Sequence, residues 1–497
     1  MKTRGLFLSA LLMGAVMAGC SNEEVLNNEV ENSAKKSDNY VSVNIVAPGG
    51  FGSRGADEGF EKGVGDESKV DDAIFLFYDA NGNFVDASKA DLNPWTDGNT
   101  GSIDKVSNAV IVLSNPKTWP TQMVTLLNTG EELSTYRNLD LDDMLDKIDD
   151  YSSTESFVMS NSYYRTDEGE ITATKLSQNN ICKTRDEAER PENAVQVYVE
   201  RVLAKVSADA SDVEYKGILD EGGNTIQTAL DGKDVTFNVS VKGMALVHTN
   251  PDSYLIKRVE SEPTWEGWND SNNFRSYWAT SAEPEYPDYY ETLSWNEVEN
   301  EESVTEYLGY CHENTSNVYT KLLVAAQFTV TDSETGTVAS PTVYKFNGTY
   351  FTLDALKTYI RSEYFGNNVA TEDMSFVQAT GEGKKAWHVE LQLSEELAAE
   401  HSEVLKSVNA KNISCWTDGK CYYYVDIEHF GNDGCEVGVV RNHWYQLTIN
   451  SIAGLGTPVI DPNDPINPDR PEEENYYVAA QVNVLQWKVV SQNVDLK

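Results

Sequence analysis

The chain has 497 residues, enough for two or three domains, and 40% of them are hydrophobic and 10% aromatic, so it can bury cores. Its 80 Asp and Glu residues against 38 Lys and Arg give a net charge of −42. A surface of that sign repels phosphate backbones and offers no basic patch to anionic lipid, so we expect no nucleic-acid partner.

The N-terminus has the pattern of an export signal. Lys2 and Arg4 precede an apolar run over 6–19, which is too short to span a bilayer and has the size of a signal-peptide core. Small residues then lead into Cys20. We predict that 1–20 is a lipoprotein signal peptide ending at a lipidated Cys20. An ordinary secretory signal that contains a cysteine is the alternative.

The region 21–54 is predicted to be a propeptide that carries the first β-strand. Apolar side chains alternate along 40–47 and share one face of that strand: Val41, Val43, Ile45 and Ala47. A loop rich in glycine follows and contains Arg54 and Gly55. Loops of this composition are exposed and are where proteolysis concentrates.

The rest of the chain reads mostly as short strands separated by turns. Residues 73–78 are strongly apolar and lead into a hairpin turn, and 195–206 is another strong strand. Helical spacing is scarce and is limited to 139–148, 354–363 and 394–409. The pattern predicts a mainly β protein with two β-sandwich domains in tandem. Their predicted limits are 55–209 for the N-terminal domain and 210–460 for the C-terminal domain.

The sequence lacks the motifs of nucleotide-binding, nucleophilic and zinc-dependent enzymes, so we expect no enzyme, no cofactor and no metal site. Cys415, Cys421 and Cys435, with His429 between them, match no zinc spacing. With a turn at 417–419, Cys415 and Cys421 would face each other on a hairpin and could form a disulfide. Two free buried thiols are the equal alternative.

The C-terminus combines a spacer with an apolar strand. Prolines recur every third residue within 461–475, which predicts a polyproline II spacer of about 45 Å. The donor strand predicted within 476–497 carries these apolar residues: Val478, Ala480, Val482, Val484, Leu485, Trp487 and Val489. The apolar phase changes sides between Val484 and Leu485, which indicates a bulge or two segments. An exposed strand of this kind either folds back onto its own domain or enters the sheet of another molecule.

The first strand and the tail share the same alternating pattern. If the chain is cut after Arg54, the first strand can leave, and the tail of a neighbour could fill the groove. Burial of six large apolar residues of the tail gives an upper bound of about 9–18 kcal/mol.

On these features the chain resembles the fimbrillin-type pilins of Bacteroidales, in particular the shaft subunit of the short fimbria of Porphyromonas. The resemblance covers most of the chain, and its best-matched pieces are the lipobox, 52–56, 74–82, 199–206, 440–445, 452–456, the proline-rich linker, 484–489 and 494–496.

The resemblance implies two transthyretin-like domains and a lipid-anchored precursor at the outer membrane. It also implies cleavage between Arg54 and Gly55 by an arginine-specific surface protease, then polymerisation into a cell-surface fimbria by strand exchange. The implied partners are other copies of the chain, accessory, tip or anchor subunits, and the lipoprotein export machinery. Adhesion and biofilm formation would be the role, with the receptor unknown.

Three alternatives remain open at this stage. A non-polymerising surface lipoprotein could bind glycans through its many Trp and Tyr residues. A tip or anchor subunit is a closer variant, although a tip subunit should lack a donor tail. A surface hydrolase is the third.

Overall fold

The computed structural model describes residues 39–48, 63–92, 96–97, 103–113, 117–219, 223–226, 228–260, 263–272, 274–282, 293–300, 303–381, 383–429, 437–466, 478–485 and 489–496. Strands predominate in these residues, which confirms the predicted mainly β fold. All of them belong to one compact unit.

The N-terminal half is built on a ten-stranded sheet whose two layers face each other. Its strands are β1 (Asn39–Pro48), β2 (Ala73–Tyr78), β3 (Phe84–Lys89), β4 (Thr96–Asp97), β5 (Ile103–Leu113), β6 (Gln122–Leu127), β8 (Met159–Asn161), β11 (Thr174–Lys175), β12 (Ile181–Cys182) and β13 (Val195–Arg201). Strand β13 joins the layers, because its first part pairs with β1 and its last part pairs with β8.

Strand β2 is buried on both sides, which explains its unbroken apolar sequence. Phe75 and Phe77 lie in the core between the layers, together with residues of β1 and β5. Ile74 and Leu76 face a second core, which α1 (Leu133–Tyr136) and α2 (Leu141–Leu145) cover. A strand with apolar contacts on both faces shows no alternation of polar and apolar residues.

The C-terminal half is a sandwich of two further sheets with one core between them. The six-stranded sheet contains β14 (Leu203–Asp209), β15 (Glu214–Gly217), β21 (Glu306–His312), β30 (Trp444–Ala453), β32 (Val478–Leu485) and β33 (Val489–Leu496). The eleven-stranded sheet contains β16 (Thr228–Leu230), β17 (Lys233–Val247), β22 (Lys321–Asp332), β23 (Val338–Ala339), β24 (Val343–Phe346), β25 (Thr349–Phe351), β26 (Ser375–Gln378), β27 (His388–Gln392), β28 (Ile413–Trp416), β29 (Lys420–Asp426) and β31 (Thr457–Pro458).

Three short strand pairs complete the sheets of the described residues. They are β7 (Ile148–Asp149) with β18 (Ser253–Tyr254), β9 (Tyr164–Thr166) with β10 (Gly169–Ile171), and β19 (Asn269–Asp270) with β20 (Arg275–Ser276). The β7–β18 pair links the N-terminal half to the C-terminal half.

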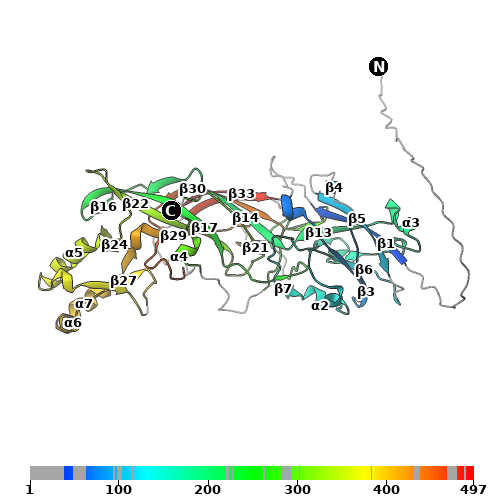
Figure 1. Cartoon of the computed structure of the whole chain (residues 1–497), viewed down its shortest axis with the longest axis horizontal. Helices are drawn as coiled ribbons and strands as arrows, with labels where there is room; N and C mark the ends of the chain where they lie inside the picture. Colours follow the sequence, from blue (N-terminus) through cyan, green and yellow to red (C-terminus); the bar gives the residue numbers. More distant parts are fainter. Residues whose placement is uncertain are drawn as a thin grey trace, which may run out of the picture. The chain divides into compact units, whose positions relative to one another are not determined.

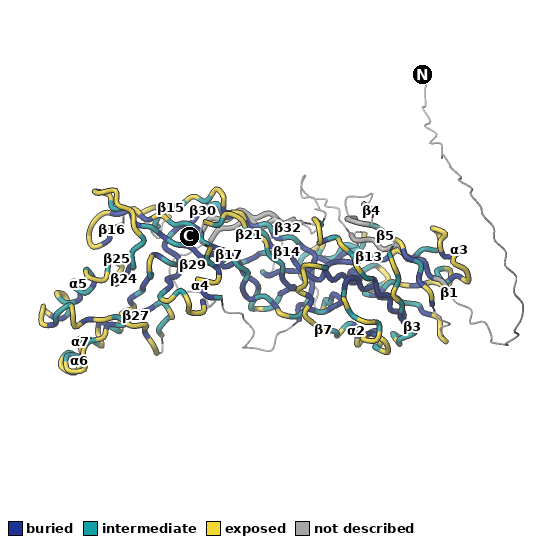
Figure 2. Tube along the Cα trace, viewed as in Figure 1, coloured by how far each residue is buried: buried dark blue, intermediate teal, exposed yellow. Residues whose placement is uncertain are grey.

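The helices are short and peripheral. The longer ones are α5 (Leu353–Phe365), α6 (Glu395–Glu400) and α7 (Ser402–Asn409), which gather beside β24 and β27 (Figure 1). The others are α3 (Arg185–Ala188), α4 (Trp295–Val298), and the 3-10 turns Gly65–Ser68 (η1), Gln178–Asn180, Pro191–Asn193, Thr371–Asp373 and Thr417–Gly419. Figure 2 shows many exposed residues on α5 to α7 and α3, whereas the central strands are largely buried. Within the described residues, no helix has the length and apolar character needed to cross a bilayer.

At Val202, between β13 and β14, the chain passes from the N-terminal sheet to the C-terminal sandwich. This residue lies ahead of the domain boundary that we predict between residues 209 and 210. The next strand, β14, pairs with β21 and β30 and therefore belongs to the C-terminal sandwich. Strands β13 and β14 form one apolar run in the sequence, so their pattern does not show that they enter different sheets.

The described residues of the predicted proline spacer, 461–466, are mostly exposed but contain a turn, so this part of the spacer is not fully extended. Ile466 is buried against Trp295 and Val298, and its amide N–H donates to the carbonyl of Leu293. The Asp461 side chain accepts a bond from the amide of Asn463, which turns the chain instead of extending it.

Of the two alternatives left open for Cys415 and Cys421, the structure has the two free buried thiols and not the disulfide. Asp418 adopts a left-handed conformation, and the two flanking strands go to different neighbours: β28 to β24 and β27, and β29 to β22 and β31. The cysteines consequently lie in separate cores. Burial raises the pKa of the Cys415 thiol to about 11, so the thiol stays protonated at neutral pH.

Candidate functional site

Strand β1 occupies an interior position in the N-terminal sheet, between β5 and β13 (Figure 1). It pairs antiparallel with β5 from Asn39 to Pro48, and parallel with β13 from Val43 to Val46. We call this position between β5 and β13 the β1 slot. Without β1, both neighbouring strands would lose a ladder of main-chain hydrogen bonds on one edge.

One side of β1 is packed into the core between the layers. Val41 and Val43 are fully buried there, beside Ile111 of β5 and Val197 of β13. The alternation predicted from the sequence therefore holds at these two positions. Ile45 and Ala47 lie on the same strand, and their backbone pairing places them in register with Ser107 and Lys105 of β5.

The other side of β1 faces a polar hollow of about 740 Å³. Ser42 of β1, Asn108 of β5 and Gln196 of β13 line it. Val41 and Val43 thus point into the core and Ser42 points toward the hollow, as the period of two predicts.

The predicted modification sites lie outside the described residues. Cys20, Arg54 and Gly55 fall in ranges that the structure does not describe. The described chain leaves β1 at Pro48 and resumes at Gly63, so the predicted scission point lies between these two residues in the sequence.

The predicted donor segment forms two strands, β32 and β33, on either side of 486–488. Strand β33 pairs parallel with β30, from Trp444 with Val489 to Ser451 with Asp495, and β32 pairs antiparallel with β33. The predicted donor residues are divided between these strands: Val478, Ala480, Val482, Val484 and Leu485 belong to β32, and Val489 begins β33, whereas Trp487 lies outside the described residues. In the single chain the tail therefore lies on the sheet of its own C-terminal half, with β32 at the edge of that sheet.

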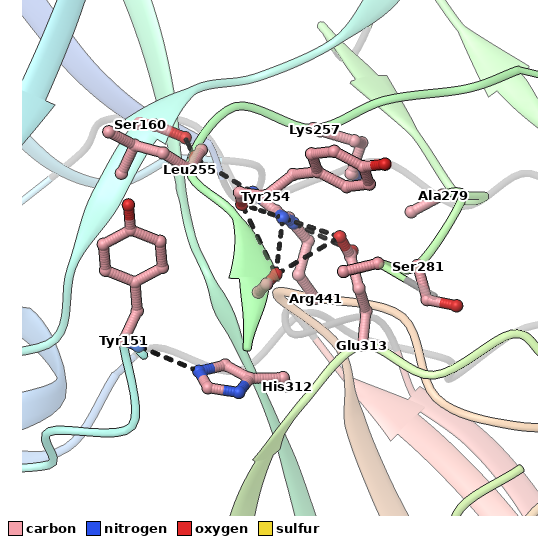
Figure 3. A network of polar contacts seen from close by, with 12 residues as sticks. Tyr151, Ser160, Tyr254, Leu255, Lys257, Ala279, Ser281, His312, Glu313 and Arg441 are labelled. Carbon is pink, nitrogen blue, oxygen red and sulfur yellow. Dashed lines mark hydrogen bonds and ion pairs between the residues drawn. The ribbon is translucent and has the colours of Figure 1, made fainter. Parts of the chain in front are cut away.

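A buried network of charged groups lies where the two halves meet (Figure 3). The Arg441 guanidinium forms an ion pair with Glu313, with N–O distances of 2.8 and 2.6 Å, and both side chains have no exposed surface. Arg441 also donates to the Ser253 hydroxyl and to the carbonyl of Leu255. Burial opposes its charge, but Glu313 more than compensates and raises the pKa of Arg441.

A second buried pair joins the same region, with Lys257 Nζ 2.9 Å from Glu200 Oε2. Burial raises the pKa of Glu200 and lowers that of Lys257, because removal from water disfavours each charge and their attraction offsets only part of this. His312 accepts a hydrogen bond from the amide of Tyr151 at Nε2 and bonds the carbonyl of Asn250 through Nδ1. The network thus connects residues of both halves (Figure 3).

This network was not predicted from the sequence, although a signal was present. Glu200 and Arg201 interrupt the apolar run 195–206, and such charges in a strand that is otherwise apolar indicate buried partners. The charged groups of this network form ion pairs with one another, which indicates a structural role. Among the described residues, no group of three or more His, Cys, Asp or Glu side chains could hold a metal ion.

The C-terminal part of the chain matches a known family. Residues 414–493 match the model described as the major fimbrial subunit protein type IV, fimbrillin, C-terminal. This match confirms the resemblance to fimbrillins that the sequence indicated, and it supports a fimbrial subunit role at the cell surface.

No curated protein matches the chain. Solved structures with distant similarity to the chain include the following three. A candidate cell adhesion protein from Parabacteroides distasonis is 14% identical with a TM-score of 0.37, over 91% of this chain and 96% of that one. The tip fimbrial protein Mfa3 from Porphyromonas gingivalis, with a C-terminal truncation, is 12% identical with a TM-score of 0.31, over 90% and 100%. A fimbrial assembly protein from Parabacteroides distasonis is 10% identical with a TM-score of 0.28, over 60% and 98%.

Proposed function

We propose that the chain is the shaft subunit of a cell-surface fimbria that assembles by strand exchange. It would be exported as a lipoprotein on Cys20 and cut between Arg54 and Gly55 by an arginine-specific protease. The C-terminal segment 476–497 of one copy would then replace β1 in the β1 slot of the next. The two halves would act as tandem transthyretin-like domains, and the filament would serve adhesion and biofilm formation.

The observation that carries this proposal is that β1 is an interior strand supplied by the chain ahead of Arg54. A cut after Arg54 would separate β1 covalently from the sandwich that it completes. Because β1 has a strand on each side and Val41 and Val43 in the core, its departure would leave two unpaired edges and an apolar groove. Only a strand with a similar apolar pattern can both pair with the two edges and fill the apolar groove.

The position of the tail supports exchange in energetic terms. In the single chain, β32 pairs with β33 and lies at a sheet edge. In the β1 slot, a strand gains main-chain partners on both sides and buries one face in the core. For β32 the move would therefore replace an edge position by an interior one, whereas β33 already pairs with both β30 and β32 in the single chain and would give up two ladders to enter the slot.

Of the four tryptophans in the 260–300 region, two are half-buried, Trp265 and Trp268, and the other two give no support to the glycan-binding alternative. Trp278 and Trp295 are buried, and the indole N–H of Trp295 donates to the carbonyl of Cys421. They serve as core residues, so we do not propose a binding platform there.

The test compares Arg54→Ala with Lys62→Ala, which removes a nearby cation but keeps Arg54. We expect wild type and Lys62→Ala to give protein that begins at Gly55 and a ladder of polymers on a gel of unheated samples. Arg54→Ala should remain a lipidated monomer, because its first strand cannot leave. Polymers from Arg54→Ala, or elongation by a chain that lacks 476–497, would contradict the proposal.

A further inference from the structure

The first described segment behind the predicted scission point contains one buried charge. In η1, Gly65 and Asp66 are exposed, and Lys69 that follows is exposed too, whereas Glu67 is only 3% exposed. A buried carboxylate in an exposed turn indicates that the side chain holds the segment onto the rest of the molecule.

Every polar atom of Glu67 that faces inward has a partner. Its Oε1 lies 2.6 Å from Lys205 Nζ and accepts a hydrogen bond of 2.5 Å from the Tyr310 hydroxyl. Its Oε2 accepts from the amide of Val64, and its carbonyl oxygen accepts from Arg201 Nε at 2.6 Å. Burial opposes ionisation, but the bonds from Lys205 and Tyr310 outweigh it and lower the pKa of Glu67.

The partners of Glu67 belong to three strands around the change of sheet. Arg201 ends β13, Lys205 lies on β14 and Tyr310 lies on β21. Lys205 is itself fixed, because its ammonium lies 3.9 Å from the ring centre of Trp444 on β30. Lys205 and Tyr310 therefore lie on strands that do not pair with β1, and Arg201 lies at the end of β13 that pairs with β8 and not with β1.

The next attachment along the chain is Asn128. Its side chain accepts from the amide of Asp71 and donates to the carbonyl of Lys69. The contacts of Glu67 thus come before those of Asn128 along the chain.

We propose that Glu67, with Arg201, Lys205 and Tyr310, forms an anchor that ends the released segment. This inference rests on the proposed function: when β1 leaves, the anchor holds the chain at residues 63–68, so that opening does not spread into β2. Glu67 is a positioning residue for strand release and makes no contact with the incoming strand.

Hydrogen exchange measured by mass spectrometry tests the anchor on the purified full chain, before and after a single cut after Arg54. In wild type, we expect the amides of 63–68 to keep the same protection after the cut. In Glu67→Gln, we expect their exchange after the cut to rise by about tenfold or more, because the buried ion pair is lost. The matched control is Asp66→Asn, which removes the same charge from an exposed neighbour and should change nothing.

Tyr310→Phe provides a milder variant in case Glu67→Gln fails to fold. It removes one hydrogen bond and keeps the ring contact with Phe157, whose centroid lies 5.0 Å away. We expect a smaller rise in the exchange of 63–68 in the cut chain. The anchor is overturned if wild-type 63–68 loses protection on cutting, or if Glu67→Gln behaves like Asp66→Asn. Polymer formation is measured separately. If strand exchange fails, the hydrogen-exchange comparison of 63–68 still tests the anchor.

Discussion

Strand β1 and the buried network around Arg441 are held in the fold by opposite kinds of contact. Strand β1 is fixed by main-chain ladders to β5 and β13 and by the apolar contacts of Val41 and Val43. The network is fixed by particular side chains whose charges and hydrogen bonds match one another, such as Arg441 with Glu313.

The difference determines which contacts can be exchanged. Main-chain ladders are the same for every sequence, and apolar burial tolerates any side chain of suitable size. In the proposed exchange, a strand with the pattern of β1 would therefore be able to replace it. A buried charge accepts only a partner of opposite sign in the right place. The network is therefore suited to holding the two halves together permanently. The β1 slot is suited to the strand replacement that we propose.

The largest effect is expected from Arg441→Met, which leaves Glu313 buried without its partner. We expect the free energy of unfolding to fall by about 3–5 kcal/mol. Chemical denaturation of the full chain measures it. Arg185→Met is the matched control, because Arg185 pairs with Glu189 on the surface, and a loss below about 1 kcal/mol is expected there.

A companion variant separates the charge from the space it fills. Arg441→Met combined with Glu313→Leu removes both charges and should recover most of the lost stability. If Arg441→Met loses no more stability than Arg185→Met, the network does not hold the two halves together as described above.

A smaller effect is expected from Val43→Ala in β1. Removing two buried methyl groups should lower the free energy of unfolding of the uncut chain by about 2 kcal/mol. Val112→Ala on β5 is the control, since Val112 is 41% exposed and should change stability by less than about 0.5 kcal/mol. Equal effects in the two variants would show that the core does not hold β1.

The smallest expected effect is the loss of stability at acid pH that the protonation of His312 causes. Burial lowers the pKa of His312, and Asp150, Arg441 and Glu313 are the charged groups that act on it. The fold keeps it neutral, so the unfolded chain binds more protons below its ordinary pKa of 6.5. Its contribution to stability is complete above that pH and is lost as the pH falls below it.

His312→Gln cannot titrate, and its amide oxygen can still accept from Tyr151. Between pH 7.5 and 5.5, we expect wild type to lose up to about 1.4 kcal/mol more stability than this variant. Thermal unfolding at both pH values measures the difference. Parallel pH profiles would show that His312 does not titrate in the way described.

Where the apolar period is clear, the sequence predicted the strand and its buried face. It did not predict which other strands pair with it. Val41 and Val43 alternate with polar residues, and the structure buries both. For Cys415 and Cys421 the sequence left a disulfide and free thiols equally open, because local pattern does not tell a hairpin from two strands that, like β28 and β29, pair elsewhere. Partners in a sheet depend on contacts between distant segments, which local pattern does not contain.

The proline spacer and the buried network show two further limits. A repeat of prolines fits both a rod and a series of turns, and the burial of Ile466 depends on Trp295, which is far away in the sequence. Glu200, Lys257, Glu313 and Arg441 are widely separated charges in a chain with 80 acidic residues. Only the fold brings them together.

The two neighbours of β1 run in opposite directions, since β5 is antiparallel to it and β13 is parallel. The two ladders space their hydrogen bonds differently, so an incoming strand satisfies both in one direction only. In the proposed filament, all subunits would therefore point the same way. One end would present an unfilled slot and the other an unused tail, so attachment to the cell and addition of subunits would occur at chemically different ends.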